Sequence, residues 1–235
     1  MKGSRANKGK VLETQIILGL LSLVKFSILS LITFNLFTLW SFMIKKNFKL
    51  FFFIEKLNEL NLDYVKKIGA ILILRKPEKV NLEDLKKFNK RCASKKITLF
   101  IQNNVKILFL LKTNNFYISA YNKGPFKQLK KINRKVKIIG SAHNIPEIHE
   151  KLTQGCEYIV LSRIFKTSNK FKKGFLGTTK FNLLTRNFSQ KFVALGGINE
   201  KKFRLLGLLD IQGCAMSGDK KKAGKYMPAF LKNNF

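Results

Sequence analysis

The chain has few acidic residues and few metal-binding side chains. Its 235 residues include 13 Asp and Glu against 46 Lys and Arg, which gives a formal net charge of +33. Only two histidines and three cysteines are present, and Cys92, Cys156 and Cys214 lie far apart without any Cys-x-x-Cys spacing. This pattern argues against a structural zinc site or a dedicated transition-metal site. Cysteines that are odd in number and widely spaced are typical of a reducing compartment.

The excess of positive charge is spread along the whole chain and is not gathered in one tail or stripe. A basic balance of this size raises nucleic acid or an anionic membrane as a partner. Because the lysines are scattered, we interpret them as a compositional bias of solvent-facing positions and predict no specific nucleic-acid partner. Such a surface still attracts polyanions at low salt.

The first 45 residues form a basic and hydrophobic extension ahead of the region that we predict to fold, residues 46–235. Residues 15–44 are mostly apolar, and residues 26–44 carry no charge. A membrane-spanning helix needs about 20 apolar residues, so one interpretation is a transmembrane helix over residues 15–44. It would anchor the protein to the inner membrane with the folded region on the cytoplasmic side. The alternative is a misassigned start, with a cytoplasmic protein that begins at Met43.

Eight short apolar runs divide the rest of the chain, and each is followed by a polar stretch with helical spacing. This alternation predicts an α/β protein built as a (β/α)8 TIM barrel, with a doubly wound sheet as the alternative. Asn81, Asn144 and Asn199 stand where helix N-caps are expected. The predicted strands cover residues 48–54, 70–74, 97–101, 116–119, 136–139, 158–161, 192–195 and 210–216.

The residues that follow each run are the candidate functional residues, because the site of a parallel barrel lies at the C-terminal ends of its strands. In Phe192–Asn199 (FVALGGIN), an apolar run stops at the pair Gly196-Gly197. A second turn, Ser217-Gly218, follows the eighth run. Backbone N–H groups at such turns can hold a phosphate. The same rule selects Arg75, Gln102, Asn103, Ser141 and His143.

Three segments resemble the thiamine phosphate synthase and thiazole tautomerase family, and they occur in the family's order. They are GSAHN at 140–144, GCEYIVLSRIFKTSNKFKKGFLG at 155–177 and FVALGGIN at 192–199. The first is similar to the family's Ser-x-His turn, the second to its phenylalanine-proline-threonine loop, and the third to its seventh strand and turn. The resemblance extends over about residues 49–218.

In the synthase branch, the resemblance implies that an aminopyrimidine diphosphate is coupled to a thiazole phosphate and that pyrophosphate leaves with the help of Mg²⁺. Arg75 and Lys170 fall on positions that would stabilise the pyrophosphate. The family's acidic Mg²⁺ ligands read here as Asn103 and, in a looser alignment, Asn122, so Mg²⁺ binding is doubtful because two neutral ligands lose the charge that makes such a site tight. The implied substrate-binding residues are Gln102, Asn103, Thr167, Asn169, Gly196, Gly197, Ser217 and Gly218.

The tautomerase branch implies a different chemistry at the same place. Shifting a double bond in a thiazole carboxylate phosphate needs a proton shuttle and no metal, and His143 is the side chain best suited to that role near neutral pH. Ser141 is expected either to contact the ligand or to cap the following helix. Three functions therefore stay open: a synthase-like enzyme, a metal-independent tautomerase-like enzyme, and a non-catalytic barrel that binds a phosphate ligand. The partners expected are a phosphorylated thiazole and, for the synthase, the pyrimidine diphosphate.

Overall fold

We analysed a computed structural model, which describes residues 48–58, 60–167 and 174–217. The predicted extension over residues 1–45 lies outside the described residues, and so does the choice between a transmembrane helix and a later start. Among the helices of the described residues, none is both long enough and apolar enough to cross a bilayer.

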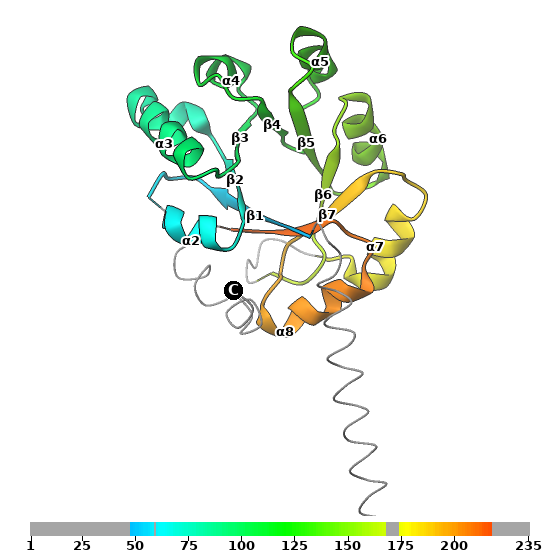
Figure 1. Cartoon of the computed structure of the whole chain (residues 1–235). Coiled ribbons are helices and arrows are strands. Elements are labelled where there is room, and N and C mark those ends of the chain that lie inside the picture. The colour runs from blue at the N-terminus through cyan, green and yellow to red at the C-terminus, as the bar shows by residue number, and fades with distance from the viewer. Residues whose placement is uncertain (1–47, 59, 168–173, 218–235) are drawn as a thin grey trace, which may run out of the picture. The chain divides into compact units, whose positions relative to one another are not determined.

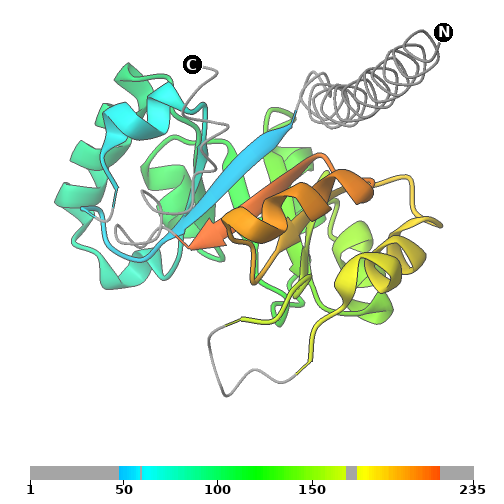
Figure 2. The ribbon, with the colours of Figure 1, turned by 90° about the horizontal axis from the view of Figure 1, so that it is seen from below.

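The described chain forms a closed barrel of eight parallel strands, with the helices around the outside (Figure 1). Each strand pairs with the next, and β8 pairs with β1 to close the ring, so these two strands lie side by side in Figure 2. The predicted (β/α)8 fold is confirmed, and the doubly wound alternative is wrong. The strands are β1 (Lys49–Ile54), β2 (Ile71–Leu74), β3 (Leu99–Gln102), β4 (Asn115–Ile118), β5 (Lys137–Ala142), β6 (Tyr158–Ser162), β7 (Lys191–Leu195) and β8 (Gly213–Ser217).

Five of the described helices begin at an asparagine whose side chain accepts backbone N–H bonds of the first turn, and the sequence predicts three of these caps. Asn81, Asn144 and Asn199 cap α3, α6 and α8 in this way, and Asn61 and Asn104 cap α2 and α4. The helices are α2 (Leu62–Lys67), η1 (Pro77–Lys79), α3 (Leu82–Ser94), α4 (Val105–Leu110), η2 (Phe126–Gln128), α5 (Leu129–Ile132), α6 (Ile145–Thr153), α7 (Gly177–Thr185), α8 (Glu200–Phe203) and η3 (Arg204–Leu208).

The barrel interior is filled by side chains, as in other eight-stranded parallel barrels. Alternate residues of each strand point inward, and the inward set forms one continuous buried cluster. Removing this apolar surface from water is the main stabilising contribution of the barrel. The cluster contains Phe51, Phe53, Ile73, Phe100, Tyr117, Ile139, Val160, Val193 and Ala215.

The ends of two strands differ from the prediction in ways that matter for the site. β5 continues through Ser141, which pairs with Val160 of β6, so this serine belongs to the sheet and Asn144 is the cap of the next helix. β8 begins at Gly213 and not at Asp210. In both places the runs of apolar residues differ from the strands because hydrogen-bonded pairing, not side-chain polarity, sets where a strand starts and ends.

Candidate active site

A layer of polar side chains lies next to the apolar core, at the C-terminal end of the barrel. They follow from the two-residue period of the strands, because each lies two positions after a residue of the core cluster. All except Arg75 are less than about a tenth exposed. They are Arg75 after β2, Gln102 at the end of β3, Ser119 after β4, Ser141 in β5 and Ser162 at the end of β6.

Arg75 holds its guanidinium group over the ring of Phe53, with the Cζ atom 4.5 Å from the ring centroid. Its Nη1 atom is 4.0 Å from Oε1 of Glu55, and both side chains are about half exposed. An exposed ion pair of this length contributes little to stability. The guanidinium lies at the C-terminal end of the barrel, and its role in binding an anion stays a prediction.

Tyr117 and Ser141 form a buried hydrogen-bonded pair that sequence reasoning missed in part. Tyr117 is a core residue of β4, and burial raises the pKa of its phenol to about 12, although a side-chain hydrogen bond from Ser141 and the charge of Arg75 act in the opposite direction. Ser141 thus supports Tyr117 from inside the barrel and is 8% exposed. The two-residue period of the predicted strand over residues 116–119 could have identified Tyr117, because it places Phe116 and Tyr117 on opposite faces of the sheet.

The two asparagines at the expected metal-ligand positions already use their side chains within the protein. Asn103 donates from Nδ2 to Oγ of Ser119 (2.7 Å), and its Oδ1 accepts from the Ser119 backbone N–H (3.0 Å). Oδ1 of Asn122 accepts from the Gly124 backbone N–H (3.0 Å), and the Asn122 carbonyl accepts from the ammonium group of Lys151 (2.8 Å). These two residues do not fit Mg²⁺, because their oxygens are engaged, neutral and, at Asn122, next to a cation.

His143 lies just beyond β5 and is tied to Glu147 in the first turn of α6. The ring Nδ1 is 2.9 Å from Oε2 of Glu147, and the His143 backbone N–H donates to the same oxygen (2.8 Å). The His143 side chain is 50% exposed and that of Glu147 is 27% exposed. The histidine is therefore oriented by a carboxylate while part of its ring faces solvent at the barrel end.

The turn Gly196-Gly197 packs closely against the chain that leaves β6. The Ile164 and Phe165 backbone N–H groups donate to the carbonyls of Leu195 and Gly196, each at 3.0 Å. Gly197 has a φ of +67°, and a Cβ atom there would lie 2.5 Å from the Phe165 carbonyl oxygen, so only glycine fits.

The backbone N–H groups of Gly197 and the following Ile198 donate no hydrogen bond to another described residue. Both N–H groups follow β7 at the C-terminal end of the barrel, and their role as donors to a phosphate stays a prediction. Ser217 ends the neighbouring strand β8 at the same end of the barrel, paired with Phe53 of β1, and its partner in the prediction, Gly218, lies outside the described residues.

Thr167 ends the described part of the loop after β6. Its hydroxyl oxygen is buried and has no hydrogen-bond partner among the described residues. Asn169 and Lys170, predicted to bind substrate in this loop, lie outside the described residues. The structure thus brings Arg75, Gln102, Asn103, Ser141, His143, Thr167 and Gly196-Gly197 to one end of the barrel.

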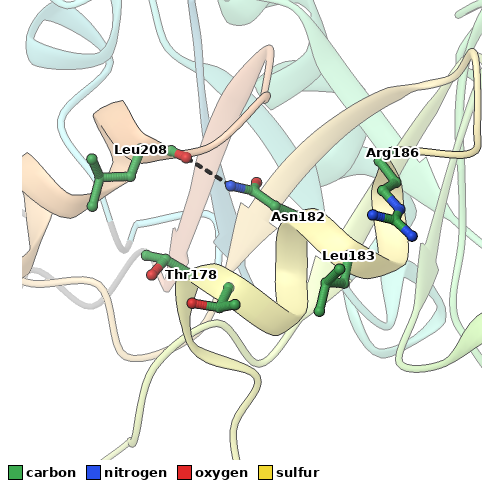
Figure 3. A pocket seen from close by; sticks show the side chains of 6 residues that line it. Thr178, Asn182, Leu183, Arg186 and Leu208 are labelled. Carbon is green, nitrogen blue, oxygen red and sulfur yellow. Dashed lines mark hydrogen bonds between the residues drawn. The ribbon is translucent and has the colours of Figure 1, made fainter.

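Two surface hollows contain none of the predicted site residues. One, of about 440 Å³, lies between α7 and η3, where Nδ2 of Asn182 donates to the Leu208 carbonyl at 2.8 Å (Figure 3). The other, of about 600 Å³, lies between the loop after β1 and α3.

Residues 55–219 match the model of the TMP-TENI family, which is described as thiamine monophosphate synthase. The chain belongs to this family. A thiamine-phosphate synthase of Prochlorococcus marinus subsp. pastoris is 29% identical over 124 residues, which cover 52% of this chain and 35% of the relative. A second one, from another strain of Prochlorococcus marinus, is 28% identical over 125 residues, covering 53% and 36%. The match therefore spans about a third of the length of these curated relatives.

Solved structures agree with the fold of this thiamine monophosphate synthase family member. A thiamine phosphate pyrophosphorylase from Pyrococcus furiosus superposes with a TM-score of 0.59 at 15% identity, covering 80% of this chain and 96% of that chain. An aldolase from Escherichia coli K12 superposes with a TM-score of 0.54 at 10% identity, covering 75% and 78%. At such identities the likeness shows the fold alone.

Proposed function

We propose that this chain is a thiamine-pathway enzyme that binds a thiazole phosphate at the C-terminal end of its barrel. Membership of the thiamine monophosphate synthase family supports the pathway. The backbone N–H groups of Gly197 and Ile198, which donate to no other described residue, support the phosphate, since such donors at a tight turn hold phosphate oxygens. Ser217, which ends the neighbouring strand β8, completes the proposed phosphate site together with Gly218, which follows it in the sequence.

One candidate reaction is the coupling that gives thiamine phosphate. In it, a carbon–oxygen bond between the aminopyrimidine methylene and its diphosphate breaks, a bond to the thiazole nitrogen forms, and pyrophosphate leaves. Arg75 and Lys170 would stabilise the departing pyrophosphate, and Gln102, Thr167 and Asn169 would bind substrate. The names of the curated relatives favour this reaction, whereas the engaged amides of Asn103 and Asn122 do not.

The other candidate is a proton transfer that moves a double bond in a thiazole carboxylate phosphate. His143 would take a proton from one ring position and return one at another, so no atom is gained or lost and no metal is needed. The observation that carries this candidate is the 2.9 Å contact between Nδ1 of His143 and Glu147, because a proton-transferring histidine is commonly oriented by a carboxylate. The geometry of the chain supports this reaction better than the coupling.

The two reactions separate in a paired assay with purified full-length protein. One arm supplies the pyrimidine diphosphate and thiazole phosphate with and without Mg²⁺, and the other supplies the thiazole tautomer alone. If proton transfer is the function, His143→Ala lowers tautomerisation by about 10²–10⁴-fold. Coupling that depends on Arg75 and survives His143→Ala would instead identify a synthase. Binding of thiazole phosphate with neither reaction would identify a non-catalytic barrel and refute the enzyme.

A further inference from the structure

The contact between His143 and Glu147 defines which nitrogen of the ring carries the proton. An ionised carboxylate only accepts hydrogen bonds, and Oε2 of Glu147 already accepts from the His143 backbone N–H at 2.8 Å. Nδ1, at 2.9 Å from the same oxygen, must therefore donate. In the neutral imidazole the proton then lies on Nδ1, and Nε2 is left with a free lone pair.

Glu147 is itself held in place by the start of α6. Its backbone N–H donates to Oδ1 of Asn144 at 2.9 Å, and Nδ2 of Asn144 donates to Oε1 of Glu147 at 3.2 Å. Asn144 and Glu147 are the N-cap and the third residue of this helix, which is the spacing of a capping box. Both carboxylate oxygens are thus engaged, and the side chain cannot turn away without losing several hydrogen bonds.

We propose that Glu147 is a positioning residue that holds His143 as the Nδ1–H tautomer, so that Nε2 is the atom that exchanges the proton with substrate. The carboxylate also stabilises the imidazolium that forms when Nε2 accepts a proton, as in other carboxylate–histidine pairs. This inference rests on the proposed proton transfer for its catalytic consequence. Its structural part, the tautomer, does not depend on any substrate.

The usual role of a glutamate at this helix position is to cap the helix, so the test needs a matched control. Asp84 occupies the equivalent position in α3, three residues after the cap Asn81, and its backbone N–H donates to Oδ1 of Asn81 at 3.3 Å. Asp84→Asn therefore removes a carboxylate from the same position in the first turn of a helix that holds no histidine. Any effect of losing a helix cap alone will appear in both variants.

The tautomer can be read directly by nitrogen-15 NMR of the two imidazole rings, which gives different two-bond correlations for Nδ1–H and Nε2–H. The chain has only two histidines, so His143→Ala assigns the signals and His149, whose ring packs on Phe188, is an internal reference. We expect His143 to be the Nδ1–H tautomer in the wild type and in Asp84→Asn. In Glu147→Ala we expect a mixture of both tautomers, with His149 unchanged.

The kinetic part compares Glu147→Gln and Glu147→Ala in the tautomerisation assay. Glu147→Gln keeps an oxygen for Nδ1–H, so it should retain the Nδ1–H tautomer but lower the turnover rate, because the imidazolium loses its carboxylate partner. Glu147→Ala should lose the single tautomer and lower the turnover rate by about tenfold or more, and Asp84→Asn should keep both the tautomer and the turnover rate of the wild type. An Nε2–H tautomer in the wild type, or an unchanged tautomer in Glu147→Ala, would overturn the inference.

The outcomes also separate this inference from the proposed function. If His143 is the Nδ1–H tautomer but the protein shows no turnover, the positioning by Glu147 is supported and the proposed proton-transfer reaction is refuted. Turnover that depends on His143 but is the same in Glu147→Ala would keep the reaction and overturn the role of Glu147.

Discussion

At the scale of single residues, Gly197 combines a left-handed backbone conformation with close packing. Its φ of +67° costs an L-residue about 1–2 kcal/mol, and a Cβ atom would also lie 2.5 Å from the carbonyl oxygens of Phe165 and Lys166. Gly69 has a similar φ of +61°, but nothing lies within 4 Å of its Cβ position. The two glycines therefore separate backbone strain from steric conflict.

We predict that Gly69→Ala lowers the free energy of unfolding by about 1 kcal/mol and leaves thiazole phosphate binding unchanged. Gly197→Ala should lower the free energy of unfolding further, because the loop after β6 must move. It should also weaken thiazole phosphate binding about tenfold or more, since losing a hydrogen bond to a charged group costs about 1.5–3 kcal/mol. Urea unfolding and calorimetric titration of both variants measure the two effects. Equal binding by the two variants would remove Gly197 from the phosphate site.

At the scale of elements, the sequence predicted helix caps, which depend on neighbouring residues. It missed the ends of strands, which depend on pairing with other strands. The caps at Asn81, Asn144 and Asn199 could be predicted because a short side chain bonds the backbone next to it. The apolar run at 136–139 predicts a strand that ends before Ser141, yet the pairing of Ser141 with Val160 keeps this residue in β5. No local signal predicted that Glu147 would reach back to His143.

Lys151 is another feature that no local pattern predicted. This residue of α6 is fully buried, and its ammonium group donates to the Asn122 carbonyl (2.8 Å) and to Oε1 of Gln154 (2.9 Å). Gly140 makes room for its aliphatic stem, because a Cβ there would lie 2.8 Å from Cδ of Lys151. The lysine thereby joins α6 to the loop after β4.

Burial lowers the pKa of Lys151 below its ordinary value of 10.5. Between the lowered pKa and 10.5 the unfolded chain binds more protons at this residue than the folded chain, so its contribution to stability rises with pH in that window. We predict that the difference in free energy of unfolding between the wild type and Lys151→Met moves in favour of the wild type from neutral pH toward pH 10.5. Urea unfolding of both proteins across this range measures the difference, and a constant difference would contradict a lowered pKa at Lys151.

At the scale of the whole molecule, the side chains of all three cysteines are buried. Cys92, Cys156 and Cys214 are free and buried, as expected for small core residues in a chain without disulfides. Burial raises the pKa of the Cys92 thiol to about 11 and those of Cys156 and Cys214 to about 12. Their chemistry is therefore that of inert core residues and not that of reactive thiols.

A raised thiol pKa stabilises the folded state below the ordinary value of 9.0 and loses that contribution as pH rises toward the folded value of about 12. For Cys214 alone this amounts to about 2 kcal/mol by pH 10.5. We predict that the wild type loses this much more stability than Cys214→Ala between pH 8 and pH 10.5. Urea unfolding at the two pH values measures it, and parallel losses in both proteins would show that the thiol is not buried.

The central claim about the molecule is that its barrel end binds a thiazole phosphate through backbone donors at the glycine turn. Calorimetric titration of the full-length protein with thiazole phosphate, and with the same thiazole lacking the phosphate, tests it most directly. The phosphorylated compound should bind at one site, and removal of the phosphate should weaken binding by at least about tenfold, the equivalent of 1.4 kcal/mol. A folded protein that binds neither compound, or binds both equally, would contradict the claim.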